Sequence, residues 1–111
     1  MRVITGSRDR RLKLWDVSSG QELWTAQGHV KAINGVAFSP NGMQIVSWSE
    51  DQTLVLWDAA TGHRVRSFQG HADWITSARF SPDGLRIVSG SFDKTIKLCD
   101  AAFGREVRTI Q

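Results

Sequence analysis

The fold is decided by residues 39–58, which read SPNGMQIVSWSEDQTLVLWD. The same pattern returns 42 residues later in residues 81–100, SPDGLRIVSGSFDKTIKLCD. Its second part is already present at the start of the chain, where residues 1–16 read MRVITGSRDRRLKLWD. Three copies in one register predict an internal repeat of about 42 residues, which has to be recognised before any other feature is interpreted.

A second marker, the dipeptide Gly-His, keeps the same register. It occurs at residues 28–29 and again at residues 70–71, which are also 42 residues apart. When residues 28–69 are aligned with residues 70–111, about half of the positions are identical. Because these markers are independent of one another, their common spacing indicates repetition of a structural unit.

Each complete repeat is expected to form four short strands joined by tight turns. In the repeat that begins at Gly28, the alternating or apolar segments are residues 33–38, 43–49, 53–57 and 64–68. The chain reverses at Ser-Pro-Asn-Gly, because proline fixes φ and glycine accepts a positive φ. No segment has a sustained helical period, and none leaves room for a crossover of a dozen residues. The pattern therefore predicts an all-β fold of antiparallel sheets.

The period, Gly-His, Ser-Pro-Asp-Gly and a strand ending in Leu-Trp-Asp together resemble the WD40-repeat family of β-propellers. The resemblance covers the whole chain and implies four-stranded antiparallel blades. Residues 1–27 would form an incomplete blade without its first strand, and residues 28–69 and 70–111 two complete blades. Such propellers close with about 4–8 blades, so we expect a partial β-propeller of about two and three-quarter blades. A fragment of a larger propeller is the preferred interpretation, and self-association through the open repeat ends is the alternative.

Composition excludes several classes of protein. The net charge of +3, from 14 basic and 11 acidic residues, is too small to argue for nucleic acid by itself. Cys99 is the one cysteine, so no disulfide framework is possible and a reducing compartment fits best. No apolar run approaches the roughly 20 residues of a membrane helix, and the N-terminus does not resemble a secretory signal. We therefore expect a cytoplasmic protein without a membrane partner, with a nuclear location left open.

Three residue types in the central repeat match those of a hydrolase triad: His29, Ser47 and Asp51. The resemblance to WD40 repeats implies instead a structural hydrogen-bond network that these residues form with Trp57. A buried indole N–H needs an acceptor, and a serine hydroxyl can accept from tryptophan while it donates to histidine. No nucleophile-elbow motif or oxyanion arrangement accompanies the three residues. The structural interpretation is preferred, and no catalytic residue is assigned.

The other two repeats carry incomplete versions of this network. The third repeat has His71, Ser89 and Asp93, but Cys99 replaces the tryptophan. The first repeat has Thr5, Asp9 and Trp15 and lacks the histidine. Only the central repeat is therefore expected to be fully connected, and packing around Cys99 is expected to be looser.

The resemblance also implies a recognition rim, because the family groups its fourth-to-first-strand and second-to-third-strand loops on one side. In this sequence that rim would carry Trp74, Phe92, Thr76, Ala32, Asn34, Glu50 and Arg8. Trp74 and Phe92 stand out, since the repeat equivalents Ala32 and Glu50 show that the scaffold needs no aromatic side chain there. Aromatic residues on such a surface are typical anchors for a protein partner. Packing on a neighbouring loop is the alternative.

The expected function is a non-catalytic protein–protein interaction scaffold of WD40 repeats. No cofactor or metal is expected, because the sequence has no phosphate-binding glycine loop and no zinc-ligand spacing. Two alternatives stay open. The chain could be a regulatory or sensor segment of a multidomain signalling NTPase, or it could bind an anion or nucleic acid through a basic cluster of Arg8, Arg10, Arg11 and Lys13.

Overall fold

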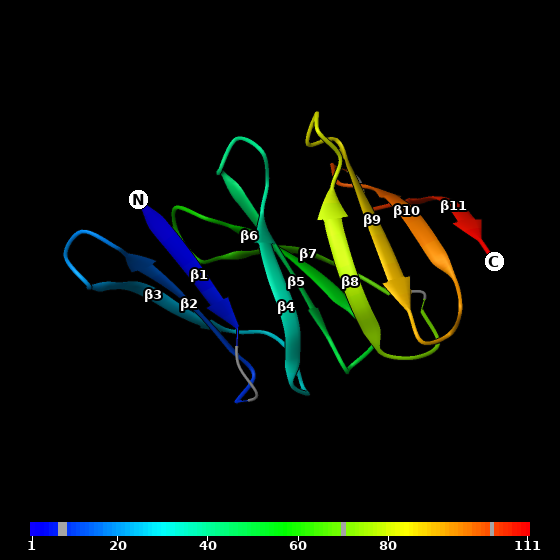
Figure 1. Ribbon diagram of the computed structural model, residues 1–111, viewed down its shortest axis with the longest axis horizontal. Helices are drawn as coiled ribbons and strands as arrows, with labels where there is room; N and C mark the ends of the chain where they lie inside the picture. The colour runs from blue at the N-terminus through cyan, green and yellow to red at the C-terminus, as the bar shows by residue number, and fades with distance from the viewer. Residues whose placement is uncertain (7–8, 70, 103) are drawn as a thin grey trace.

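A computed structural model describes residues 1–6, 9–69, 71–102 and 104–111. Three antiparallel sheets stand in a row, which we call blades one, two and three (Figure 1). Blade one contains β1 (Arg2–Gly6), β2 (Arg11–Asp16) and β3 (Glu22–Gln27). Blade two contains β4 (Ile33–Phe38), β5 (Gln44–Ser49), β6 (Leu54–Asp58) and β7 (Arg64–Phe68). Blade three contains β8 (Ile75–Phe80), β9 (Arg86–Ser91), β10 (Ile96–Asp100) and β11 (Glu106–Ile110).

The predicted all-β partial propeller is confirmed by this arrangement. Strands follow one another within each blade, with the orders β1-β2-β3, β4-β5-β6-β7 and β8-β9-β10-β11. Blades one and three lie at opposite ends of the row, so one chain does not close the ring (Figure 1). The described segments contain no helix with the length and hydropathy to cross a bilayer.

The turns β1–β2, β5–β6 and β9–β10, one in each blade, share a backbone feature. The residue after the turn aspartate has a positive φ in all three blades, at Arg10 (73°), Gln52 (74°) and Lys94 (69°). An aspartate stabilises this strained turn by accepting a hydrogen bond from the backbone N–H two residues later. In blade two Asp51 Oδ1 accepts from Thr53 N at 2.9 Å. Thr53 therefore belongs to the turn, and β6 begins one residue later than the sequence predicted.

The core consists of two apolar clusters, each enclosed between neighbouring blades. We call the surface that a blade turns toward the following blade its front face, and the opposite surface its back face. The front face of blade one and the back face of blade two enclose Leu12, Leu14, Ile33, Ile45, Val55, Trp57 and Ala59. The front face of blade two and the back face of blade three enclose Val46, Leu54, Leu56, Phe68, Ile75, Ala78, Ile87, Cys99 and Ala101. Each sheet thus buries its apolar side chains against the next sheet, as repeat proteins do.

Polar contacts also join neighbouring blades. The indole Nε1 of Trp24, on the outer strand of blade one, donates to the Ala59 carbonyl of blade two at 2.9 Å. Asn34 Nδ2, one of the predicted rim residues of blade two, donates to the Ile75 carbonyl of blade three at 3.1 Å. These contacts fix the relative positions of the loops that the blades present.

Candidate functional site

The hydrogen-bond network of blade two joins a loop, two strands and a turn. His29 precedes β4, Ser47 lies on β5, Asp51 lies in the β5–β6 turn and Trp57 lies on β6. Trp57 Nε1 donates to Ser47 Oγ at 2.9 Å, and Ser47 Oγ lies 2.7 Å from His29 Nε2. His29 Nδ1 lies 2.9 Å from Asp51 Oδ2. The four side chains therefore form one continuous chain of hydrogen bonds.

Donors and acceptors in this chain match when the imidazole carries its proton on Nδ1. The Ser47 hydroxyl then accepts from Trp57 and donates to Nε2, while Nδ1–H donates to Asp51. Ser47 is 0% exposed, and its oxygen is engaged on both sides. A triad nucleophile has to face its substrate, so this geometry suits a structural network.

Burial and hydrogen bonding set the protonation states of the pair. Burial lowers the pKa of His29 below its usual value, although the hydrogen bond and charge of Asp51 act in the opposite direction. Burial alone would raise the pKa of Asp51, but hydrogen bonds from Thr53 and His29 outweigh it and lower that pKa. At neutral pH the network therefore contains a neutral imidazole and a charged carboxylate.

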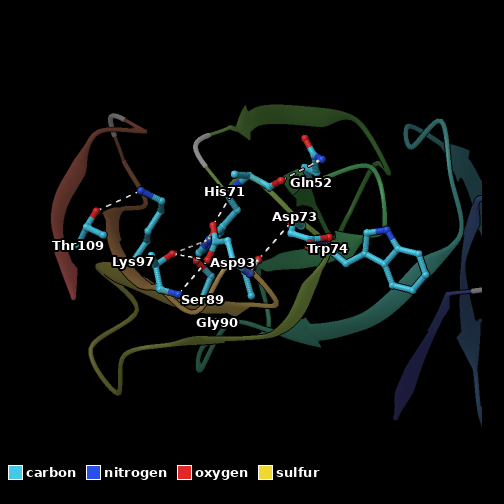
Figure 2. A network of polar contacts seen from close by, with 12 residues as sticks. Gln52, His71, Asp73, Trp74, Ser89, Gly90, Asp93, Lys97 and Thr109 are labelled. Atoms are coloured by element: carbon cyan, nitrogen blue, oxygen red, sulfur yellow. Dashed lines mark hydrogen bonds and ion pairs between the residues drawn. The ribbon is translucent and has the colours of Figure 1, made fainter. Parts of the chain in front are cut away.

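Blade three forms the same network without the indole. His71 Nδ1 lies 3.0 Å from Asp93 Oδ2, and His71 Nε2 lies 2.8 Å from Ser89 Oγ (Figure 2). Burial would raise the pKa of Asp93, but hydrogen bonds from Thr95, the Ala72 N–H and His71 lower it far below its usual range. Replacement of the tryptophan by Cys99 thus removes one donor and leaves the histidine and aspartate contacts in place.

Packing around Cys99 is much tighter than the loss of an indole ring would suggest. A cavity of about 10 Å³ remains, lined among others by Phe68, His71, Ser89 and Cys99. Phe68, on the front face of blade two, occupies the position that Ala26 has in blade one. The large aromatic side chain is therefore Trp57 between blades one and two, and Phe68 between blades two and three. The sequence prediction of looser packing overlooked this compensation across the blade boundary.

Burial also explains the state of the thiol. Cys99 is a free and buried cysteine. Burial raises the pKa of the Cys99 thiol, with the negative charge of Glu106 as a second cause. A thiol that stays protonated is a poor nucleophile and a poor metal ligand, which fits the interpretation of Cys99 as a small core residue.

Blade one has the weakest version of the network. Trp15 Nε1 donates to Thr5 Oγ1 at 3.2 Å, and Asp9 Oδ1 accepts from Arg11 N at 3.2 Å. Trp15 is partly exposed, whereas Trp57 is buried. Residues 1–27 contain no histidine.

Sequence reasoning missed two threonines that complete the networks. The Thr53 hydroxyl donates to Asp51 Oδ1, and its oxygen lies 3.2 Å from His29 Nδ1. Thr95 repeats both contacts with Asp93 and His71. The spacing Asp-x-Thr in both repeats was the available signal, because an aspartate in a turn commonly bonds a polar residue two positions later.

The predicted rim residues Trp74 and Phe92 lie next to each other in blade three. Trp74 precedes β8 and Phe92 follows β9, and Phe92 N donates to the Trp74 carbonyl at 3.0 Å. Their ring centroids are 6.0 Å apart, and the ring planes are tilted by 57°. Both remain open to solvent, with exposed fractions of 42% and 60%. Figure 2 shows the Trp74 ring directed away from the His71–Asp93 network.

The other rim residues lie in equivalent loops. Glu50 N donates to the Ala32 carbonyl at 3.1 Å, which is the blade-two counterpart of the Phe92–Trp74 contact. Asn34 lies where the β4–β5 register shifts, and Thr76 where the β8–β9 register shifts. Such a β-bulge redirects a side chain out of the regular strand alternation. Arg8 falls outside the described residues.

Two side chains of the basic cluster have partners of their own within the described residues. Arg10 Nη1 contacts the Val30 carbonyl at 3.5 Å. Lys13 Nζ pairs with Glu22 at 3.4 Å and lies 5.9 Å from the centre of the Trp15 ring. Among the residues that the structure describes, there is no group of three or more histidine, cysteine or acidic residues able to hold a metal ion.

Comparison with known proteins decides the family. A family model described as "WD domain, G-beta repeat" matches residues 1–16, 20–58 and 62–100. The chain belongs to the WD40 family. Its matched segments begin at other points than the predicted units 1–27, 28–69 and 70–111, so those boundaries remain a prediction.

The relatives that match are longer WD-repeat proteins. The chain is 55% identical over 40 residues to Nuclear distribution protein PAC1-2 of Postia placenta, which covers 36% of this chain and 9% of the relative. It is 49% identical over 43 residues to Dynein assembly factor with WD repeat domains 1 of Mus musculus, covering 38% and 10%. It is 40% identical over 40 residues to the Lissencephaly-1 homolog of Caenorhabditis briggsae, covering 36% and 10%. Each aligned segment thus spans about a tenth of the relative and about one repeat.

Proposed function

We propose that this WD40 segment is a non-catalytic scaffold that binds a protein partner through the rim of blade three. Membership in the family supports the general role, because rigid blades hold variable loops in fixed positions. The networks at His29 and His71 support a structural use of the polar residues, since Ser47 and Ser89 are both buried. The specific site rests on one observation, the exposed pair of Trp74 and Phe92.

The aromatic pair is not needed by the blade. Ala32 and Glu50 occupy the same two positions in blade two, where the equivalent backbone hydrogen bond is also made. Two tilted rings with exposed faces can enclose an apolar or cationic side chain of a partner, and aromatic residues dominate the binding energy of many interfaces. We therefore propose Trp74 and Phe92 as the anchor and Thr76, Asn34, Ala32, Glu50 and Arg8 as its surroundings.

The names of the relatives do not identify the partner. They refer to nuclear distribution and to dynein assembly. Since each alignment covers about one repeat, the identity reflects residues that build a blade. The proposal is therefore limited to a protein ligand that presents a side chain to the aromatic pair.

We also propose a cytoplasmic location. A single buried thiol fits a reducing compartment. Fractionation of cells that express the parent protein with a small epitope tag would test this, and recovery of the protein from the secretory pathway would contradict it.

Peptide selection provides a direct test of the rim. Peptides selected from a random library on the 111-residue chain would be measured by fluorescence anisotropy against Trp74→Ala and Phe92→Glu. Each substitution installs the residue found in blade two. Loss of a hot spot costs about 2 kcal/mol or more, so we expect Kd to rise at least about tenfold.

Val30→Ala is the matched control, because Val30 is an exposed apolar residue on the equivalent loop of blade two. It should leave Kd unchanged. If peptides bind the Trp74→Ala and Phe92→Glu variants as tightly as the parent chain, the site assignment is wrong. Labelling of Ser47 or Ser89 by a fluorophosphonate probe would contradict the non-catalytic role.

A further inference from the structure

The aromatic pair on the rim of blade three has a carboxylate beside it. Asp73 directly precedes Trp74, and its Oδ1 accepts a hydrogen bond from the Trp74 backbone N–H at 2.8 Å (Figure 2). This bond holds the carboxyl group against the backbone of the tryptophan. The other carboxyl oxygen, Oδ2, has no partner among the residues that the structure describes. The two rings therefore have an unpaired negative charge as their neighbour.

Blade two carries the opposite charge at this position. Three residues of the two rim loops differ between the blades: Asp73 stands in place of Lys31, Trp74 in place of Ala32 and Phe92 in place of Glu50. The backbone hydrogen bond that joins the two loops is nevertheless made in both blades, at 3.1 Å in blade two and 3.0 Å in blade three. The loops of blade three thus gain two aromatic rings and exchange a base for an acid, and the fold requires none of these changes.

The geometry of the rings favours a compact cation. The faces of aromatic rings carry negative partial charge and attract cations. The centroids of Trp74 and Phe92 are 6.0 Å apart and the ring planes are tilted by 57°, so the rings leave no parallel gap for a flat group. A guanidinium is flat, whereas the ammonium of lysine is a compact charge with three donors. A lysine side chain therefore suits this open wedge better than an arginine.

The position of Asp73 argues against an apolar side chain as the ligand. Asp73 is half-buried in the free chain, and a partner that covers Trp74 also covers the residue next to it. An apolar side chain would leave the carboxylate buried and unpaired, which is costly. An ammonium that rests on the rings can donate to Oδ2, and a hydrogen bond between two charged groups is among the strongest in proteins.

The nearest base of the same blade, Lys94, is not placed to neutralise this carboxylate. The repeat equivalents of Lys94 are Arg10 and Gln52. Both side chains reach the loop before the first strand of the following blade, away from the loop of their own blade. Lys94 has the same positive φ as these two residues. None of the ion pairs within the described residues includes Asp73.

We propose that Trp74, Phe92 and Asp73 form one site for a lysine side chain of a protein partner. The alkyl stem and the ammonium lie on the exposed ring faces, and the ammonium donates to Oδ2 of Asp73. This inference rests on the proposed function, because it names the side chain that the rim of blade three receives.

The test uses the peptides selected on the 111-residue chain. Those that lose affinity for Trp74→Ala and Phe92→Glu should share a lysine. This lysine would be replaced by norleucine, which keeps the stem and removes the charge, and in a second peptide by arginine. Fluorescence anisotropy should show Kd rising about 5- to 30-fold with norleucine, the range of a cation on an aromatic face. Arginine should bind more weakly than lysine and more tightly than norleucine.

A substitution in the chain tests the carboxylate itself. Asp73→Asn keeps an acceptor for the Trp74 N–H and removes the charge. It should raise Kd of the lysine peptide about threefold, as expected for an exposed ion pair, and leave Kd of the norleucine peptide unchanged. Asp83→Asn is the matched control, since it makes the same change of charge in the β8–β9 turn and installs the residue that blade two has there, Asn41. It should leave Kd of both peptides unchanged.

The outcomes separate this inference from the proposed function. Peptides that require Trp74 and Phe92 but no lysine, or that bind equally well with norleucine, would overturn the lysine site and leave the proposed function standing. Tighter binding of the arginine peptide would show that a guanidinium is the ligand instead. Equal effects of Asp73→Asn and Asp83→Asn would show that only the net charge of the chain matters. Peptides that tolerate Trp74→Ala and Phe92→Glu would overturn both ideas.

Discussion

Blades two and three are built from closely similar sequences, yet they differ at the positions where large aromatic residues lie. Blade two buries Trp57 in its hydrogen-bond network and has Ala32 and Glu50 on the rim. Blade three buries Cys99 and exposes Trp74 and Phe92 on the rim. The comparison teaches that the repeat fixes backbone and network, while a few large side chains are placed differently: buried in blade two, and exposed in blade three on the rim that we propose as the binding site.

The largest effect is expected when blade two is given the buried residue of blade three. Trp57→Cys removes an indole that is 2% exposed and donates to Ser47. No phenylalanine faces it, because Ala26 occupies the position that Phe68 has in the next interface. Truncation of a buried tryptophan costs about 3–5 kcal/mol. Urea denaturation would measure the free energy of unfolding, and a loss below about 1 kcal/mol would mean that the indole is dispensable.

Disruption of the network itself should have the next largest effect. His29→Ala leaves both Asp51 and Ser47 without their shared partner. An unpaired buried polar group costs about 1–3 kcal/mol. Asp51→Ala should lower stability similarly, because it leaves His29 Nδ1 without its acceptor. Unchanged midpoints of thermal unfolding for His29→Ala and Asp51→Ala would refute the structural role of the network.

The compensation between blades predicts a non-additive pair of substitutions. Cys99→Trp places an indole where only about 10 Å³ is free beside Phe68. Overpacking of this kind costs about 1–3 kcal/mol. The double variant Cys99→Trp/Phe68→Ala recreates at this interface the pair that Trp57 and Ala26 form between blades one and two. Its loss of stability should therefore be smaller than the sum of the losses in the two single variants. A double-mutant cycle on urea denaturation measures the difference, and additivity would show that the two side chains do not share one space.

Acidification should weaken blade two through His29. Its folded pKa lies below the usual value of 6.5, so the unfolded chain takes up the proton first as the pH falls through that value. Stability from this residue is therefore present above pH 6.5 and lost below it. Urea midpoints measured between about pH 7.5 and 5 should fall more steeply for the parent than for His29→Gln. Identical pH profiles would contradict the assigned neutral state.

The sequence allowed the fold to be predicted because one register of 42 residues carried several markers. Three strands in blade one and four in each other blade followed from that register. The residues of the network could be named by position, since the second and third repeats each supply a histidine, a serine and an aspartate at equivalent positions. Thr53 and Thr95 were missed, although Asp-x-Thr spacing pointed to them.

Contacts between blades were harder to predict. A repeat pattern does not show that Trp57 fills the first interface while Phe68 fills the second. It also does not show that the Trp24 indole donates to the Ala59 carbonyl. Such contacts depend on which side chains of successive sheets face each other, and a linear sequence does not state that. The sequence placed Trp74 and Phe92 on one rim, but the distance, the tilt and the exposure of their rings required coordinates.

One double substitution tests the division of roles most directly. Trp74→Ala/Phe92→Glu gives the rim of blade three the residues of blade two. Exposed positions change stability by about 0.5 kcal/mol or less, so the thermal midpoint should stay unchanged while Kd for rim-selected peptides rises at least about tenfold. Peptide binding that survives in this variant, or a large fall in the midpoint, would contradict the claim that blade three binds and does so with side chains its fold does not need.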